Sequence, residues 1–258
     1  EYLQDEGGHL SVVRAMSEIV GATSVLIAAE YLSNVFDGKG LMLGGVTGVP
    51  PTEMVIIGAG TVGEFAARTA IALGAQVKVF DSSVYRLRRL QSNVGSRVFT
   101  SVVQPIVLNK AVRTCDVVIG AVRAKNGRTP CLISEDTVSK MKPNSVLIDV
   151  SIDQGGVFET SEVTNHDKPT FRKYDVIHYC VPNIASRVAR TATYALTNIF
   201  TPILIEIGEA GGMNNMIWAN QGIRSAIYLY HGNLTNKDMS EKFQLPCKDL
   251  NLIVMANL

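Results

Sequence analysis

Residues 54–63 read Met-Val-Ile-Ile-Gly-Ala-Gly-Thr-Val-Gly, a short apolar run followed at once by a Gly-x-Gly-x-x-Gly pattern. The apolar run predicts a buried strand over 54–57. The residues after the glycines predict a helix over about 62–73. Glycines between a strand and a helix can serve only a tight connection, which is the alternative to a phosphate-binding turn. Because strand, turn and helix follow in the required order, we favour the phosphate-binding turn.

Each position of this turn has a distinct physical role. Gly58 makes the tight turn, Gly60 lets the backbone approach a pyrophosphate, and Gly63 lets the helix pack closely on the strand. Thr61 and Val62 begin the helix, whose free N–H groups and positive dipole end attract an anion. The turn therefore predicts a dinucleotide-binding site that includes all five residues.

An acidic residue follows the next predicted strand, residues 76–80. Asp81 lies 18 residues after Gly63 (81 − 63), where a carboxylate accepts ribose hydroxyls and repels a 2′-phosphate. Arg86 lies in a predicted basic helix over about 84–90, and arginines there either hold a 2′-phosphate or form a solvated helix face. Because Asp81 ends the strand itself, the predicted cofactor is NAD, with Arg86 near the adenosine ribose.

The rest of the chain continues the alternation of strands and helices. Such alternation is typical of an α/β fold with a doubly wound parallel sheet of the Rossmann type, and continuous apolar strands indicate helices on both faces. Further strands are predicted at 97–99, 116–119, 146–150 and 176–179. From about Thr191 the pattern is helical: one helix runs to Glu209, a second from the glycines at 211–212 to Tyr230, and a third, short helix is capped by Asp238.

The N-terminal stretch is expected to begin as a loop over residues 1–15. Ser17 is a candidate N-cap for a helix that runs to about Phe36. A glycine-rich connection, residues 37–51, leads from there to the first strand, and its apolar residues suggest that it packs against the rest of the protein.

Composition excludes several classes of function. The 258 residues include 24 Lys+Arg and 23 Asp+Glu, so the net charge of +1 gives no general attraction for nucleic acid or anionic membrane. The uncharged run 191–205 is shorter than the roughly 20 apolar residues of a membrane span. Four scattered cysteines show no disulfide or metal-binding spacing. We therefore expect no metal site, no membrane span and a reducing, cytoplasmic location.

Ligands of doubly wound sheets bind at the carboxyl ends of the strands, where three more segments fall. The small residues of Gly-Ala-Val at 120–122 would let a cofactor lie close to the backbone; the alternative is a plain turn at the end of the strand. Residues 150–156 read Val-Ser-Ile-Asp-Gln-Gly-Gly, and Asp153 is the best catalytic candidate, with a turn-capping role as the alternative. Val-Pro-Asn-Ile at 181–184 is the third candidate for a ligand contact, and a simple Pro/Asn turn is the alternative. His178 lies inside an apolar strand and is predicted to be a core histidine.

Several segments together match one family: Met-Ser-Glu at 16–18, Gly-Gly-Val-Thr-Gly-Val at 44–49, the glycine turn at 58–63, Ile-Asp-Gln-Gly-Gly at 152–156 and Tyr-Ala-Leu-Thr-Asn at 194–198. With them the chain resembles alanine dehydrogenases and, more distantly, the NAD-binding subunit of proton-translocating transhydrogenase. The resemblance implies reversible oxidative deamination of L-alanine to pyruvate and ammonium with NAD.

The resemblance also implies roles for individual residues. Ser17 would contact the pyrophosphate, Val122 and Val150 would lie beside the cofactor, and Asp153 would act as an acid/base near the nicotinamide. Three residues of the last segment, Val181, Asn183 and Ile184, would close over the nicotinamide.

Domain organisation is also implied by the resemblance. Residues 1–15 would be the remnant of a substrate domain, 16–189 the NAD-binding domain, and 190–258 helices that complete the substrate domain. The substrate-binding arginine and lysine and the catalytic histidine of the family have no counterpart here, so the fragment alone is expected to be inactive. A homo-oligomer, a hexamer by the resemblance, is expected. The alternatives are an NAD(H)-binding transhydrogenase subunit and a non-catalytic NAD-binding module.

Overall fold

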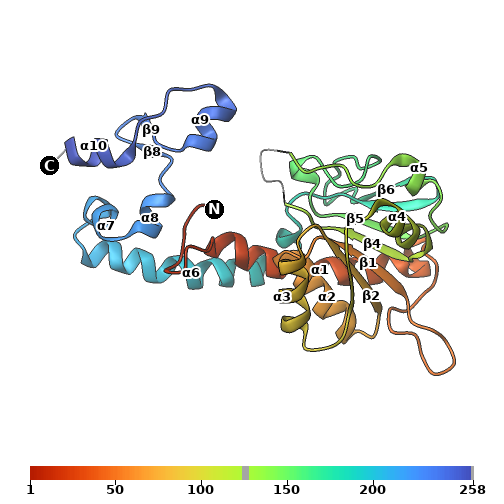
Figure 1. Ribbon diagram of the computed structural model, residues 1–258. Helices are drawn as coiled ribbons and strands as arrows, with labels where there is room; N and C mark the ends of the chain where they lie inside the picture. Colours follow the sequence, from red (N-terminus) through yellow and green to blue (C-terminus); the bar gives the residue numbers. More distant parts are fainter. Residues whose placement is uncertain (124–127, 257–258) are drawn as a thin grey trace. The chain divides into compact units, whose positions relative to one another are not determined.

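The computed structural model describes residues 1–123 and 128–256 (Figure 1). The chain divides into two compact units. We call Met16–Ala192 the sheet unit, and Glu1–Ala15 together with Thr193–Leu258 the helical unit. Each unit has its own hydrophobic core.

In the described part of the sheet unit, seven strands form one sheet in the order β3-β2-β1-β4-β5-β7-β6. All pairs are parallel except β6 with β7. The order reverses direction between β1 and β4, and ligands of such sheets bind at this switch point. This confirms the predicted doubly wound fold. The strands are β1 (Glu53–Ile57), β2 (Gln76–Asp81), β3 (Phe99–Val102), β4 (Val117–Gly120), β5 (Val146–Asp149), β6 (Thr170–Lys173) and β7 (Val176–Tyr179).

Alternate side chains of the buried strands enter two different hydrophobic clusters. Met54 and Ile56 of β1 pack with α1, α2 and α3, whereas Val55 and Ile57 pack with α4 and α5. Helices therefore cover both faces of the sheet, which explains why β1 is apolar from Met54 to Ile57 (Figure 1). The helices are α1 (Ser11–Leu32), α2 (Thr61–Ala72), α3 (Val84–Val94), α4 (Pro105–Thr114) and α5 (Glu135–Val138).

The first helix differs from the prediction. Helix α1 begins at Ser11, so Ser17 lies inside it and does not cap it. The prediction of a loop over all of residues 1–15 was therefore wrong for residues 11–15. By length and composition α1 passes the test for a membrane-crossing helix, as the core helix of a soluble protein also can. Its residues Ala28 and Leu32 are fully buried in the core of the sheet unit. The C-terminal half of α1 therefore packs in the core of the sheet unit.

Two strands near the sheet edges also differ from the prediction. Strand β3 covers Phe99–Val102, two residues later than the predicted 97–99. Strand β6 was not predicted, because Thr-Phe-Arg-Lys is short and partly exposed and lacks the apolar run of a central strand. It joins β7 through Tyr174 and Asp175, both with φ near +55°. Such a two-residue turn lets β6 run back antiparallel beside β7.

In the helical unit, α6 ends at Glu209 as predicted, but the segments after it are shorter than predicted. The prediction of a single helix up to Tyr230 was wrong, because the extended backbone of Asn220 ends α7. The Asn220 side chain then caps α8 by accepting a hydrogen bond from the Ile223 N–H at 3.1 Å. Asn236, and not Asp238, caps α9, since its side chain accepts from the Met239 N–H. The described elements are α6 (Ala189–Glu209), α7 (Met213–Ala219), α8 (Gln221–Ser225), β8 (Leu229–Tyr230), β9 (Asn233–Leu234), α9 (Lys237–Phe243) and α10 (Leu250–Ala256).

Candidate functional site

The glycine turn joins β1 to α2 at the switch point of the sheet. A Cβ added to Gly58 would overlap the carbonyl oxygen of Ala121, and one added to Gly63 would overlap the carbonyl oxygen of Gly58. At Gly60, by contrast, a Cβ would meet no described atom within 4 Å. Gly58 and Gly63 are therefore required by the packing of the protein itself. The space above Gly60 is open, as a turn that receives a pyrophosphate requires.

Asp81 lies at the end of β2 beside this turn. Its Oδ2 accepts a hydrogen bond from the Ala59 N–H at 2.7 Å, and its Oδ1 accepts one from the Ser83 N–H at 2.7 Å. The Arg86 Nη1 lies 3.9 Å from Oδ2, and Arg86 is half exposed. The structure thus brings Asp81, Arg86 and the glycine turn together, and the carboxylate also fixes the turn, a role that the sequence did not suggest.

Helix α1 approaches the start of α2 closely at Gly21. A Cβ on Gly21 would overlap the Val62 carbonyl oxygen and come within 2.8 Å of the Phe65 Cβ. Ser17 lies four residues earlier, on the same face of α1 and one turn away. Ser17 itself is half buried within α1. The sequence analysis missed Gly21, although a lone glycine within a helical pattern often marks such a close contact.

The carboxyl ends of β4 and β5 are joined by hydrogen bonds. The Val150 N–H donates to the Gly120 carbonyl at 2.9 Å. The Ser151 hydroxyl donates to the Val122 carbonyl at 2.8 Å and lies 3.0 Å from the Val122 N–H, which donates to it. Val122 and Val150 are therefore held on neighbouring strand ends, and both side chains are only half buried.

Asp153 lies on a short 3-10 turn, Ile152–Gln154, directly after β5. Its side chain is exposed, and its carboxylate has no hydrogen-bond or ion-pair partner within residues 1–123 and 128–256. An exposed, unpartnered carboxylate after the end of a strand can exchange protons with a bound substrate or water. The alternative turn-capping role of Asp153 has no supporting contact in the same residues.

A second carboxylate lies directly behind this turn. Asp149, the last residue of β5, is fully buried, and its oxygens accept hydrogen bonds from residues of the loop. Burial raises the pKa of Asp149, although these hydrogen bonds to the ionised form oppose the shift. The sequence analysis missed this residue, because an acid at the end of a strand gives no sign of whether it points outward or inward.

The segment at 181–184 differs from what the resemblance implied. Val181 and Ile184 are each 2% exposed and belong to the hydrophobic core of the sheet unit. Their side chains cannot close over a cofactor. Asn183 between them is exposed and adopts a left-handed conformation with φ of 57°. Contacts of this segment with a ligand would therefore come from Asn183 and the backbone.

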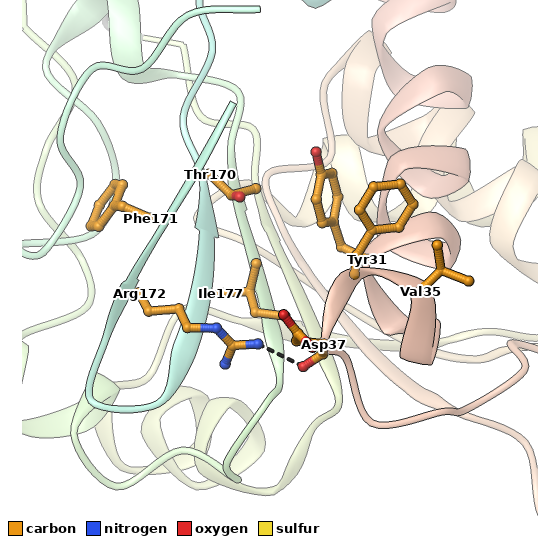
Figure 2. Close-up of a pocket in the computed structure, with 8 residues that line it drawn as sticks. Tyr31, Val35, Asp37, Thr170, Phe171, Arg172 and Ile177 are labelled. Carbon is orange, nitrogen blue, oxygen red and sulfur yellow. Dashed lines mark hydrogen bonds between the residues drawn. The ribbon is translucent and has the colours of Figure 1, made fainter. Parts of the chain in front are cut away.

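A separate cavity of about 490 Å³ lies at the other end of the strands (Figure 2). Ile177 lines it and pairs with Val146, the first residue of β5, whereas the glycine turn follows the last residue of β1. In Figure 2 Arg172 donates a hydrogen bond to the Asp37 carbonyl across this cavity, at 2.6 Å. The cavity is thus at the amino edge of the sheet and does not belong to the crevice at the carboxyl edge.

His178 is a core histidine, as predicted. It is fully buried, its Nε2 lies 2.8 Å from the Thr160 hydroxyl, and its Nδ1 lies 3.0 Å from the Val176 carbonyl. Its ring stacks on Phe171 with 4.7 Å between centroids. Burial lowers the pKa of His178, so the neutral imidazole is the form that the fold accommodates. These contacts are structural and lie away from the glycine turn.

Replacing His178 with glutamine should change how stability depends on pH. A histidine with a lowered pKa binds a proton more readily in the unfolded chain, so stability falls as the pH decreases from 6.5 towards the lowered pKa. In that window the wild-type free energy of unfolding should decline more steeply than that of His178→Gln, by up to about 1.4 kcal/mol per pH unit. Urea unfolding between pH 8 and pH 5 measures both slopes. Parallel slopes would contradict this account of His178.

Comparison with known proteins gives a consistent family. A family model described as "Alanine dehydrogenase/PNT, C-terminal domain" matches residues 24–237. The chain is 39% identical to an alanine dehydrogenase of Mycolicibacterium smegmatis over 249 residues, covering 96% of this chain and 67% of the relative. It is 40% identical to an alanine dehydrogenase of Methanococcus maripaludis, covering 92% and 64% respectively. The chain spans about two thirds of the length of these curated relatives.

Solved structures agree with the sequence relatives. An L-alanine dehydrogenase structure superposes with a TM-score of 0.88 at 35% identity, covering 94% of this chain and 66% of that chain. A transhydrogenase from Sinorhizobium meliloti superposes with a TM-score of 0.62 at 23% identity, covering 75% of this chain and 55% of that chain. The second likeness establishes a shared fold only.

Proposed function

This chain belongs to the alanine dehydrogenase/PNT family, whose C-terminal domain matches residues 24–237. We therefore propose that it supplies the NAD-binding part of an enzyme that interconverts L-alanine with pyruvate and ammonium. The observation that carries the proposal is the open space at Gly60, in a turn whose other two glycines are fixed by packing. A Cβ would fill this space, so the turn fits a group that must approach the backbone closely.

The residues of the crevice divide the work of cofactor binding. The N–H groups at the start of α2 would hold the pyrophosphate, with the Ser17 hydroxyl beside them. Asp81 would accept hydrogen bonds from the adenosine ribose, which favours NAD over NADP because its charge opposes a 2′-phosphate. Val122 and Val150 would form an apolar surface against the cofactor. Bound NAD would supply the hydride acceptor for the substrate carbon.

Asp153 is the proposed catalytic acid/base of this chain. Deamination requires a proton to leave a water molecule as it attacks the oxidised substrate, and a positioned carboxylate can hold that water or accept its proton. The exposure of Asp153 and its freedom from other partners in the described residues support this role. Asn183, exposed after β7, would contact the nicotinamide side together with the backbone around it.

The wider organisation is part of the same proposal. We place the NAD-binding domain at residues 16–189, with residues 1–15 and 190–258 contributing to a substrate domain. We expect a cytoplasmic homo-oligomer, a form in which exposed apolar side chains of α6 such as Leu204 and Ile205 would be covered.

Alanine-dependent reduction of NAD tests the proposed function. With L-alanine and NAD, the product of the complete reading frame should form NADH, which is measured by its absorbance. The rate of NADH formation should be proportional to the enzyme concentration. NADP in place of NAD should give a much lower rate. Formation of NADPH from NADP and NADH without alanine would support a transhydrogenase instead. NADH binding with no turnover of alanine would support a non-catalytic module.

A further inference from the structure

Buried Asp149 joins two ends of the loop that carries Asp153. Its Oδ1 accepts a hydrogen bond from the Ser151 N–H at 3.1 Å, before Asp153 in the chain. Its Oδ2 accepts hydrogen bonds from the Val157 N–H at 2.8 Å and the Ser161 hydroxyl at 2.6 Å, after Asp153. The carboxylate thus ties residues on both sides of the exposed turn to the end of β5.

The backbone of the loop is shaped around this carboxylate. Gly156 has a φ of 78°, and a Cβ there would come within 2.7 Å of the Asp149 Oδ2. A side chain at this position would therefore displace the carboxylate or the loop. Ser151 carries the arrangement further, because its hydroxyl is hydrogen-bonded to both backbone groups of Val122. One buried carboxylate is thereby connected to two strand ends of the proposed cofactor site.

We propose that Asp149 is a positioning residue: its carboxylate fixes the backbone of residues 151–158 and thereby sets the position of Asp153 and of Val122 towards the cofactor. This inference rests on the proposed function for its catalytic consequence, but its structural part stands independently. A carboxylate is needed because every donor that reaches Asp149 is an N–H or O–H, and an amide would turn an N–H group towards some of them.

Hydrogen exchange tests the structural part in the full chain. Asp149→Asn should speed amide exchange in residues 151–158 by on the order of tenfold relative to the rest of the sheet unit, because the amide keeps only one acceptor oxygen and either the Ser151 N–H or the Val157 N–H loses its acceptor. Ser161→Ala, which removes one donor and keeps the carboxylate, should fold normally and give a smaller rise in the same residues. NADH titrated by fluorescence should bind Asp149→Asn about tenfold more weakly and Ser161→Ala only slightly so.

Asp116 provides a matched control. It is another buried carboxylate of the sheet unit, and it accepts hydrogen bonds from Lys39 at 2.7 Å and Lys142 at 3.0 Å at the amino end of β4. Asp116→Asn should destabilise the unit without selective exchange in residues 151–158 and without a change in NADH affinity. An Asp149→Asn chain with the exchange pattern of Asp116→Asn, or with unchanged NADH affinity, overturns the proposal.

Measurements of kcat distinguish a positioning role of Asp149 from an effect on stability alone. In the product of the complete reading frame, Asp149→Asn should lower kcat, and adding it to Asp153→Asn should cause little further loss, because both act through one group. Additive losses would overturn the positioning role. Wild-type protein that fails to bind NADH would refute the proposed function, while the exchange comparison would still decide whether Asp149 fixes the loop.

Discussion

Replacing Gly60 with valine is expected to weaken NADH binding by on the order of a hundredfold, about 2.8 kcal/mol, while the protein stays folded. Gly60 has φ of −75° and ψ of −168°, which valine tolerates, and the added Cβ meets no described atom within 4 Å. The branched side chain would instead fill the space reserved for the pyrophosphate. Loss of a favourable N-cap residue should lower Tm by only about 2–4 °C.

Gly63→Val is the matched control for this prediction. Its Cβ would overlap the backbone carbonyl of Gly58, which cannot move without breaking the packing of α2 on β1. We expect a loss of about 4 kcal/mol or more of stability, and an insoluble or molten protein. Fluorescence titration and thermal melts of both variants give the comparison. Gly60→Val that binds NADH as tightly as wild type would remove the main support for the cofactor site.

Asp153→Asn should reduce alanine-dependent kcat by about a hundred- to ten-thousandfold, the range typical of a lost acid/base group. The amide has nearly the same shape but cannot accept a proton. Because the side chain is exposed and has no partner in the described residues, Tm should not change measurably. NADH affinity should stay within about threefold of wild type, since the proposed contacts to the cofactor lie mainly at the glycine turn and Asp81.

A matched aspartate provides the control for the test of Asp153. Asp167→Asn, an exposed aspartate on the loop before β6, is a suitable control and should leave turnover unchanged. Full activity in Asp153→Asn would exclude it as the acid/base.

The sequence was sufficient for the parts of the fold that repeat a strong pattern. Strand β1, the glycine turn and Asp81 were predicted correctly in place, because apolar runs of four or five residues and glycines at fixed spacing have few other solutions. The half-exposed edge strand β6 lacks such a run, and it was missed. Asn220 ends α7 through its extended backbone conformation, which the helical pattern did not reveal.

The direction in which a side chain points was the main feature of the candidate site that could not be predicted from the sequence. Asp149 and Asp153 are four residues apart, and only the structure shows that the first points into the core while the second is exposed. Val181 and Ile184 likewise follow a strand, yet their side chains face the core. Sequence position gives the edge of the sheet at which a residue lies, but the local turn decides which way its side chain points.

The antiparallel strand β6 also has a consequence for aggregation. Open sheets end in strands whose free backbone groups can pair with another chain, and charges on such strands oppose that pairing. Arg172 and Lys173 place two positive charges on β6, and Lys173 is held by Glu135 at 2.9 Å. A charged, antiparallel edge strand on this side of the sheet therefore opposes the addition of a strand from another chain next to the apolar strands β7 and β5.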